Sequence, residues 1–159
     1  MSGEPTDADA DVDAGDGTEV EGTGAVYRVE VRVVAPVRPT EVTDRVADAV
    51  RNLFPDAEVV HEEGRVVGTA RSVERFAALL RRQKILDTAR KRLLEGVRGD
   101  AVHVELKKLA AFQGVVNFSV GSPDEVGDLE VRVRVEEPSV EAFVDAVAPP
   151  TEDGEPVTE

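Results

Sequence analysis

The sequence has no cysteine and no tryptophan, only two histidines, and aromatic residues at 4%. Without cysteine the chain can form no disulfide and no thiolate nucleophile or ligand. Its longest apolar run is far too short to span a bilayer. The N-terminus also lacks the basic segment and apolar core of a signal peptide. The sequence therefore predicts a cytoplasmic protein without a membrane partner.

Catalytic motifs are also missing. There is no Gly-rich phosphate loop, no nucleophile elbow and no dinucleotide fingerprint. His61 falls at a predicted hairpin turn and His103 faces outward from a predicted strand, positions where surface histidines are commoner than metal ligands. Paired carboxylates occur mainly in the termini, where nothing would hold them in a fixed geometry. We expect no enzyme activity, no metal or other cofactor, and no small-molecule substrate.

Positive charge is scarce, since 19 Lys and Arg stand against 33 Asp and Glu, for a net charge of −14. The acids concentrate in Met1–Ala25 and Pro149–Glu159, which contain no basic residue and are predicted to be disordered. This leaves Val26–Ala148 as a single domain. Arginine outnumbers lysine by 15 to 4. Together with the acidic tails, this ratio is typical of a protein from a salt-accumulating halophile.

Alternating apolar residues predict strands over 27–35, 57–62, 65–70, 102–106, 116–120 and 129–135. A helix is predicted over 41–53, capped by Thr40 and burying Val42, and another follows the capping residue Ser139. Residues 108–114 are predicted as a loop or bulged turn, and Gly121–Asp124 as a turn. The order β-α-β-β-α-α-β-β-β-α favours an α+β fold with a mainly antiparallel sheet and helices packed on one face.

The other face of this sheet is predicted to carry charges of both signs, which would form cross-strand pairs. The charged residues are Arg28, Arg32, Arg132, Arg134, Glu30, Glu105 and Glu130. The aromatic residues predicted to lie in the core are Tyr27, Phe54, Phe76, Phe118 and Phe143. Because none of them faces outward, base stacking on this sheet is not expected.

The segment Ser72–Arg98 is the longest helical stretch, and it holds 8 of the 19 basic residues against three acids. Two apolar sets lie on different helix faces: Val73, Phe76, Ala77 and Leu80, then Ile85, Leu86, Ala89, Leu93 and Val97. One straight helix cannot bury both sets against the same surface. We therefore predict two helices, at about 72–82 with Ser72 as the cap and at about 84–97, broken at Arg81–Lys84.

The basic side chains of this stretch have two interpretations, a solvated helix face or a surface that binds RNA. The acidity of the remaining chain favours the second. A further constellation follows at Lys107–Gly114 and Asn117, where two of the four lysines accompany an aromatic ring and amides. Here the alternative is that Phe112 plugs the core under an ordinary loop. The candidate RNA-binding residues are Arg81, Arg82, Gln83, Lys84, Arg90, Lys91, Lys107, Lys108, Phe112, Gln113 and Asn117.

The run Leu80–Arg90, followed by Ala110-Ala111-Phe112-x-Gly114-x-Val116-Asn117-Phe118, resembles an archaeal family described as predicted RNA-binding proteins and sometimes as exosome subunits. The resemblance spans about Val26 to Pro149. The matching positions are Arg82, Gln83, Asp87, Ala89, Arg90, Ala111, Phe112, Gly114, Asn117 and Phe118. Relatives often carry a basic residue after Gly114, where this chain has Val115.

This resemblance implies a fold similar to that of the ribosomal protein that binds 5S ribosomal RNA. It also implies RNA, in structured form, as the partner, and it supplies no catalytic residues. The first hypothesis is therefore a non-catalytic RNA-binding protein, accessory to RNA processing or degradation. The alternative is a protein-interaction or scaffold subunit of an RNA-processing complex. In that case Arg81–Arg92 would pair with acids of a partner protein rather than with RNA.

Overall fold

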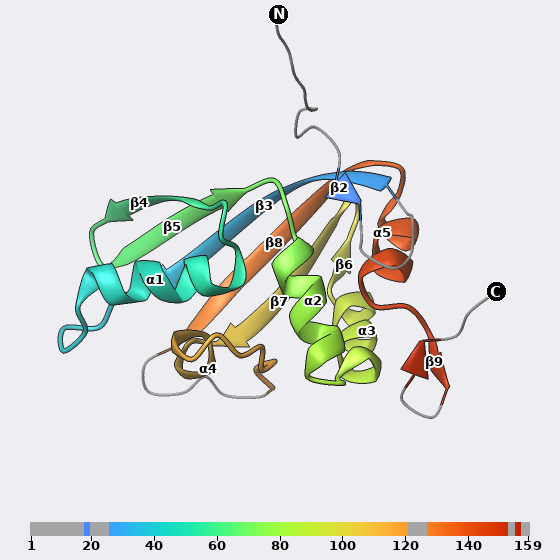
Figure 1. Cartoon of the computed structure of the whole chain (residues 1–159). Helices are drawn as coiled ribbons and strands as arrows, with labels where there is room; N and C mark the ends of the chain where they lie inside the picture. The colour runs from blue at the N-terminus through green and yellow to red at the C-terminus, as the bar shows by residue number, and fades with distance from the viewer. Residues whose placement is uncertain (1–17, 20–25, 121–126, 153–154, 157–159) are drawn as a thin grey trace, which may run out of the picture.

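A computed structural model of the chain describes residues 18–19, 26–120, 127–152 and 155–156. Its main feature is one antiparallel sheet in the strand order β4-β5-β3-β8-β7-β6 (Figure 1). These strands are β3 (Val26–Pro36), β4 (Glu58–Glu62), β5 (Arg65–Ala70), β6 (Val97–Arg98), β7 (Ala101–Lys107) and β8 (Asp128–Glu137). A short strand, β2 (Thr18–Glu19), pairs with the start of β3.

Helices lie over one face of this sheet (Figure 1). They are α1 (Thr43–Leu53), α2 (Glu74–Arg82), α3 (Leu86–Glu95), α4 (Lys108–Phe112) and α5 (Val140–Val147). The arrangement confirms the predicted α+β fold with an antiparallel sheet and helices on one face. Among the described residues, no helix is long and apolar enough to cross a bilayer.

The centre of the sheet follows from the alternation of its two longest strands. Val31 of β3 lies opposite Val133 of β8, and Val33 lies opposite Val131. All four side chains are buried under the helices, while the residues between them point to the other face. We call that other face the open face.

The core aromatic residues join the helices to the sheet, and all five are buried as predicted. The Tyr27 ring meets the Phe143 ring edge to face, with centroids 5.1 Å apart. Phe76 of α2 stacks on Phe54 at 5.7 Å and meets Phe118 edge to face at 6.4 Å. Phe118 therefore anchors the segment after α4 beneath α2.

The helical stretch is interrupted where its apolar residues change phase, as predicted. α2 ends at Arg82, α3 begins at Leu86, and Lys84 between them has φ 60°. A residue with a side chain rarely adopts this left-handed conformation, which stops the α-helical path. The break allows both apolar sets to enter the same core.

The predicted beginning of α1 is wrong. Thr40 does not cap this helix, which begins at Thr43 with Val42 as its N-cap residue. The Val42 side chain is 61% exposed instead of buried. The preceding residues form a turn, in which the Arg38 amide donates to the Glu41 carboxylate at 2.8 Å. The helix therefore starts only after this turn, in which the Glu41 carboxylate accepts the Arg38 amide.

Two further predictions are wrong between β7 and β8. Residues 108–112 form α4 instead of a loop, and residues 116–120 form no strand, since only Phe118 makes a bridge, to Leu106. A five-residue helix is too short to show a helical period, and alternation over a few residues also fits an irregular segment along a sheet edge.

The predicted end of the second helix is also wrong, because Val97 lies in β6. The predicted turn Gly121–Asp124 lies outside the described residues.

The serine caps are found at or near the predicted positions. The Ser139 hydroxyl accepts from the Ala142 amide at 3.1 Å and caps α5 as predicted. The Ser72 hydroxyl accepts from the Glu74 amide at 3.1 Å, although Val73 is the N-cap residue of α2. Serine hydroxyls thus satisfy amide groups in the first turn of both helices.

Short paired pieces occur within the predicted tails. Besides β2, the strands β9 (Thr151–Glu152) and β10 (Glu155–Pro156) pair with each other. Most of Met1–Ala25 and part of Pro149–Glu159 lie outside the described residues. The boundaries of the domain at Val26 and Ala148 therefore stay a prediction.

Candidate nucleic-acid interface

The α2–α3 turn and the segment after α4, which contain the two predicted motifs, are joined by Gln83. Its side-chain amide donates to the Val116 carbonyl oxygen at 2.8 Å, and its carbonyl oxygen accepts from the Val116 amide at 2.9 Å. These two bonds mimic a strand pair and use all of Val116's backbone polar groups. Gln83 therefore positions the turn and is not free to contact RNA.

The segment after α4 runs along the edge of β7. The Lys107 amide donates to the Asn117 carbonyl oxygen, and the Ser119 amide donates to the Glu105 carbonyl oxygen, both at 2.8 Å. The side chains of Val116 and Phe118 are buried, so that of Asn117 between them points outward. Asn117 is thus exposed next to the turn that carries Arg82 and Lys84.

α1 holds α4 from the other side. The Asn52 side-chain amide donates to the Ala111 carbonyl oxygen at 2.9 Å and caps the end of α4. Phe112 is half-buried against the core, and the Arg45 guanidinium lies 5.8 Å from its ring centroid. Gly114 follows with φ 73°, a conformation that suits glycine. Phe112 therefore serves partly as the core plug that the sequence left open as an alternative.

Lys108, predicted to bind RNA, is withdrawn from the surface. Its side chain is fully buried, and its ammonium group donates to the Pro36 carbonyl oxygen and pairs with Glu41 at 2.7 Å. The pair fastens α4 to the turn before α1. An RNA phosphate cannot reach this ammonium group unless the buried pair opens.

Arg90 is also used inside the fold. Its guanidinium donates to the Asp145 carboxylate at 2.8 Å and to the Ala148 carbonyl oxygen at 3.1 Å, and its side chain is only 27% exposed. These bonds tie α3 to the end of α5. Together with Gln83 and Lys108, Arg90 is a positioning residue, and sequence spacing gave no sign of these distant partners.

The remaining candidates are available at the surface. Arg82, Lys84, Lys91, Gln113 and Asn117 are exposed, and their side chains make no ion pair or hydrogen bond with the described residues. Lys107 and Arg81 are half-buried; two nitrogens of the Arg81 guanidinium, Nε and Nη2, are buried without a partner in the described part of the chain. We call the five exposed residues, Arg82, Lys84, Lys91, Gln113 and Asn117, the turn surface.

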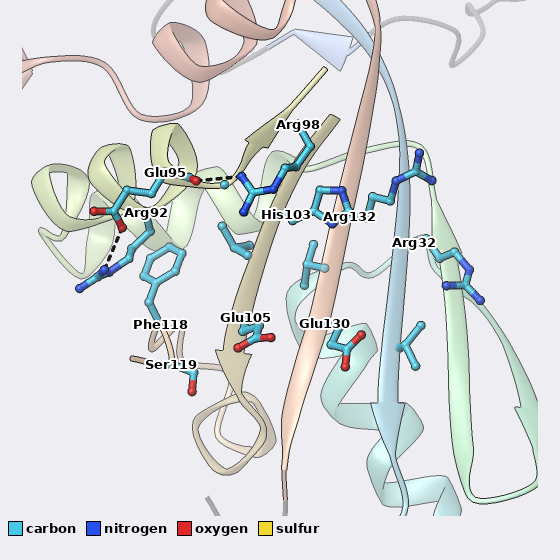
Figure 2. Close-up of a pocket in the computed structure, with 14 residues that line it drawn as sticks. Arg32, Arg92, Glu95, Arg98, His103, Glu105, Phe118, Ser119, Glu130 and Arg132 are labelled. Carbon is cyan, nitrogen blue, oxygen red and sulfur yellow. Dashed lines mark hydrogen bonds and ion pairs between the residues drawn. The ribbon is translucent and has the colours of Figure 1, made fainter. Parts of the chain in front are cut away.

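A second polar surface lies on the open face, and the sequence only partly anticipated it. Figure 2 shows His103, Arg132 and Arg32 in one row with Arg98 above it, and Glu105 with Glu130 in the next row. These side chains surround a hollow of about 420 Å³. We call this the open-face hollow. Among the described residues, the expected cross-strand pairs form only beside it, where Arg134 meets Glu30 at 3.3 Å and Arg28 meets Glu137 at 3.3 Å.

The histidines do not gather into a metal site. His61 is exposed, with Nε2 3.9 Å from Asp44, and His103 is exposed on β7. No group of three or more His, Asp or Glu side chains within the described ranges could hold a metal ion.

The molecule is thus an α+β protein with an exposed basic turn that Gln83 bonds to the segment after α4. Exposed basic surfaces are a feature of nucleic-acid-binding proteins. A family described as RNA binding matches residues 29–136, and the chain belongs to this family.

Relatives with this fold are found in several archaea. The chain is 38% identical over 144 residues to the UPF0201 protein of Aeropyrum pernix, covering 86% of this chain and 95% of that one. It is 43% identical over 136 residues to a UPF0200/UPF0201 protein of Archaeoglobus fulgidus, but this match spans 82% of the chain and only 41% of the longer relative. The crystal structure of the UPF0201 protein from Methanococcus jannaschii superposes with a TM-score of 0.76 at 34% identity, covering 81% of this chain and 99% of that one.

Proposed function

We propose that this protein is a non-catalytic RNA-binding protein that contacts RNA through the turn surface. The observation that carries the proposal is the double hydrogen bond between Gln83 and Val116. It fixes the basic turn against Asn117 while leaving the charged and amide side chains around it exposed. A surface that is held in place before binding loses little conformational entropy when RNA docks.

Each exposed side chain suits a different part of RNA. Arg82 offers a planar fork for bidentate bonds to a phosphate, while Lys84 and Lys91 offer point charges. The amides of Gln113 and Asn117 can bond base edges or ribose hydroxyls of unpaired nucleotides. Lys107 stands at the end of β7, next to Asn117. Phe112 offers less of its ring, since it packs partly against the core and the Arg45 guanidinium lies 5.8 Å from the ring centroid.

The wider role that we propose is that of an accessory factor in RNA processing or degradation, the role implied by the sequence resemblance. The rival is a scaffold subunit whose basic turn pairs with acids of a partner protein. The RNA-binding role and the scaffold role require different hydrogen-bond donors on the turn surface. A protein carboxylate satisfies Arg82 and Lys84, whereas the amides of Gln113 and Asn117 fit nucleotides and so favour RNA.

A pair of double variants tests the proposal. Arg82→Ala with Lys91→Ala removes two charges from the turn surface. The control, Arg28→Gln with Arg71→Gln, removes one charge near the start of β3 and one just after the end of β5. Binding of a structured RNA and of a single strand should be measured at about 0.1 M and about 1 M salt, where the Debye length falls from about 10 Å to about 3 Å.

We expect the first variant to bind RNA about tenfold or more weakly. Its salt dependence should also fall, by about one counterion for each phosphate that the variant no longer neutralises. The control variant should change affinity by less than about threefold. If the wild-type chain binds neither RNA at either salt concentration, the scaffold hypothesis replaces this one. An equal loss of affinity in both variants would place the interface elsewhere.

A further inference from the structure

We propose that the open-face hollow binds a ribose phosphate, separately from the turn surface. The arginine row would hold the phosphate, and the carboxylate row would accept hydrogen bonds from the ribose hydroxyls. The choice of a ribose phosphate over other phosphate esters rests on the proposed RNA-binding function. The existence of an anion site does not, since it follows from the arrangement of the side chains alone.

The first observation is a row of basic side chains across three adjacent strands. Arg32 of β3 lies directly opposite Arg132 of β8, which in turn lies opposite His103 of β7. Directly opposed residues have Cβ atoms only about 5 Å apart, and like charges in such pairs destabilise the sheet. A bound anion would turn this repulsion into a pair of charge-assisted hydrogen bonds.

The second observation is that the same strands pair their other arginines with carboxylates. Arg28 meets Glu137, and Arg134 meets both Glu30 and Glu136, at 3.2 to 3.3 Å. Arg32 and Arg132 make no such contact with the described residues, although Glu130 is only two positions from Arg132 on β8. Of the four arginines on β3 and β8, the two that line the hollow are therefore the ones without a carboxylate partner among the described residues.

The third observation is that Arg98 is held at the rim of the hollow by the backbone. Its Nη1 donates to the Glu95 and Val97 carbonyl oxygens at 3.1 and 2.9 Å. Its other nitrogens bond no described residue and can bond a ligand, and Figure 2 shows the group above the basic row. The rim depends on Gly96, because a Cβ there would lie 1.8 Å from the His103 carbonyl oxygen.

The carboxylates of the hollow indicate that its ligand carries hydrogen-bond donors in addition to a phosphate. Glu105 of β7 lies opposite Glu130 of β8, and neither side chain accepts a hydrogen bond or forms an ion pair within the described residues. This pair lies two positions from the arginine row, about 7 Å along the strands. A ligand that spans the rows must be anionic at one end and offer hydrogen-bond donors at the other, as ribose phosphate does.

The shape of the hollow also fits such a ligand. Its volume of about 420 Å³ lies within the range of small-molecule sites, about 300 to 1,000 Å³. Phe118 is the only phenylalanine, tyrosine or tryptophan of its lining and is only 6% exposed, so it offers no face for base stacking, while the exposed His103 ring belongs to the basic row. Recognition would therefore use the sugar and the phosphate, and we expect little preference for one base.

NMR titration of the isotopically labelled full chain tests this inference. The probes are AMP, deoxy-AMP, inorganic phosphate and adenosine, with a short single-stranded RNA as a further arm. The readouts are arginine Nε–H signals and the backbone amides of β3, β7 and β8. The variant Arg32→Gln with Arg132→Gln has a matched control, Arg28→Gln with Arg134→Gln, on the same two strands and the same face.

We expect AMP to shift the signals of the hollow and to bind more tightly than phosphate, with adenosine weaker than both. The Arg32/Arg132 variant should weaken AMP binding about tenfold or more, and the control variant by less than about threefold. Glu105→Gln with Glu130→Gln should remove any preference for AMP over deoxy-AMP. If the short RNA shifts the same signals at least as strongly as AMP, the source is RNA; if only AMP does, it is a free nucleotide.

Absence of AMP-dependent shifts in β3, β7 and β8 would overturn the inference, and so would an equal loss of AMP affinity in the control variant. Adenosine binding as tightly as AMP would also overturn it, because the phosphate would then contribute nothing. The turn surface is read from separate signals, those of α2, the α2–α3 turn and residues 113–117, none of which lines the hollow. Failure of RNA to shift those signals would count against the proposed function without touching the hollow.

Discussion

Single residues carry much of the stability around the interface, and Lys108 is the clearest case. Its ammonium group has no contact with solvent, and its partner Glu41 has a side chain only 11% exposed. Removing one member of a buried pair leaves the other charge without compensation, which is costlier than removing both. Lys108 thus ties the base of α4 to the turn before α1, and its ammonium group is buried away from the surface.

Lys108→Met should lower the free energy of unfolding by about 3 kcal/mol, measured by urea denaturation. Lys108→Met combined with Glu41→Gln should recover at least about 1 kcal/mol of that decrease, because the stranded carboxylate is gone while an acceptor for the Arg38 amide remains. RNA affinity of the folded single variant should stay close to wild type. A stable Lys108→Met protein that binds RNA poorly would instead make Lys108 a contact residue.

Tyr27 is a second residue whose buried polar group lowers the stability of the fold. Its hydroxyl is buried and has no hydrogen-bond partner within the described residues. Burial, reinforced by the nearby Glu74 carboxylate, raises the pKa of the phenol above its usual value of 10.0. Above pH 10 the Tyr27 phenol therefore keeps its proton in the folded chain but loses it in the unfolded chain. The stability that the protonated phenol allows is complete below pH 10 and declines as the pH rises above that value.

Tyr27→Phe should leave the stability at neutral pH unchanged or raise it by up to about 1 kcal/mol, since an unsatisfied buried hydroxyl is removed. Above pH 10 the variant should lose less stability than the wild type. Because Tyr27 is the only tyrosine and tryptophan is absent, tyrosinate absorbance reports this group alone. Ionisation of the phenol near pH 10 in the folded wild type would contradict this account of its burial.

At the scale of elements, the α2–α3 turn depends on a partner 33 residues away in the chain. Gln83→Ala would leave both backbone groups of Val116 without a partner in a buried position. We expect the free energy of unfolding to fall by about 1 to 3 kcal/mol and the Val116 amide to exchange faster with solvent. RNA affinity should fall as well, because the turn would no longer be held in a fixed geometry.

Gln113→Ala is the matched control for this change. Gln113 is an exposed amide at the end of α4 whose side chain bonds no described residue. Its removal should leave stability and the exchange of Val116 as they are, while weakening RNA binding modestly because one hydrogen-bonding group is removed from the turn surface. Equal stability of the Gln83→Ala and Gln113→Ala proteins would show that the Gln83 pairing does not hold the turn.

Elements with a regular period could be predicted from the sequence, and those that depend on distant contacts could not. The alternation in β3 and β8 and the phase change in α2–α3 are local, so both were found. α4 is too short to show a period. The uses of Gln83, Arg90 and Lys108 rest on partners 33, 55 and 67 residues away. The open-face hollow could not be predicted without the strand register, which places Arg32 opposite Arg132 rather than opposite a carboxylate.

At the scale of the whole molecule, the proposed RNA binding depends more on where the charges lie than on the net charge of −14. Long-range attraction to RNA is weak for an acidic chain, and at high salt it is screened within about 3 Å. Affinity must then come from short bonds by groups already held in place. The exposed side chains of the turn surface meet this requirement, and the prevalence of arginine over lysine is consistent with it.

The measurement that tests RNA binding at the turn most directly is ultraviolet crosslinking of the wild-type chain to RNA, followed by mapping of the crosslinked peptides. It should be done at low and at molar salt, with the Arg82→Ala and Lys91→Ala double variant alongside. We predict crosslinks within residues 81–91 and 107–117 that persist at molar salt and decline in the variant. Crosslinks that appear only at low salt, or only outside these two segments, would contradict the account.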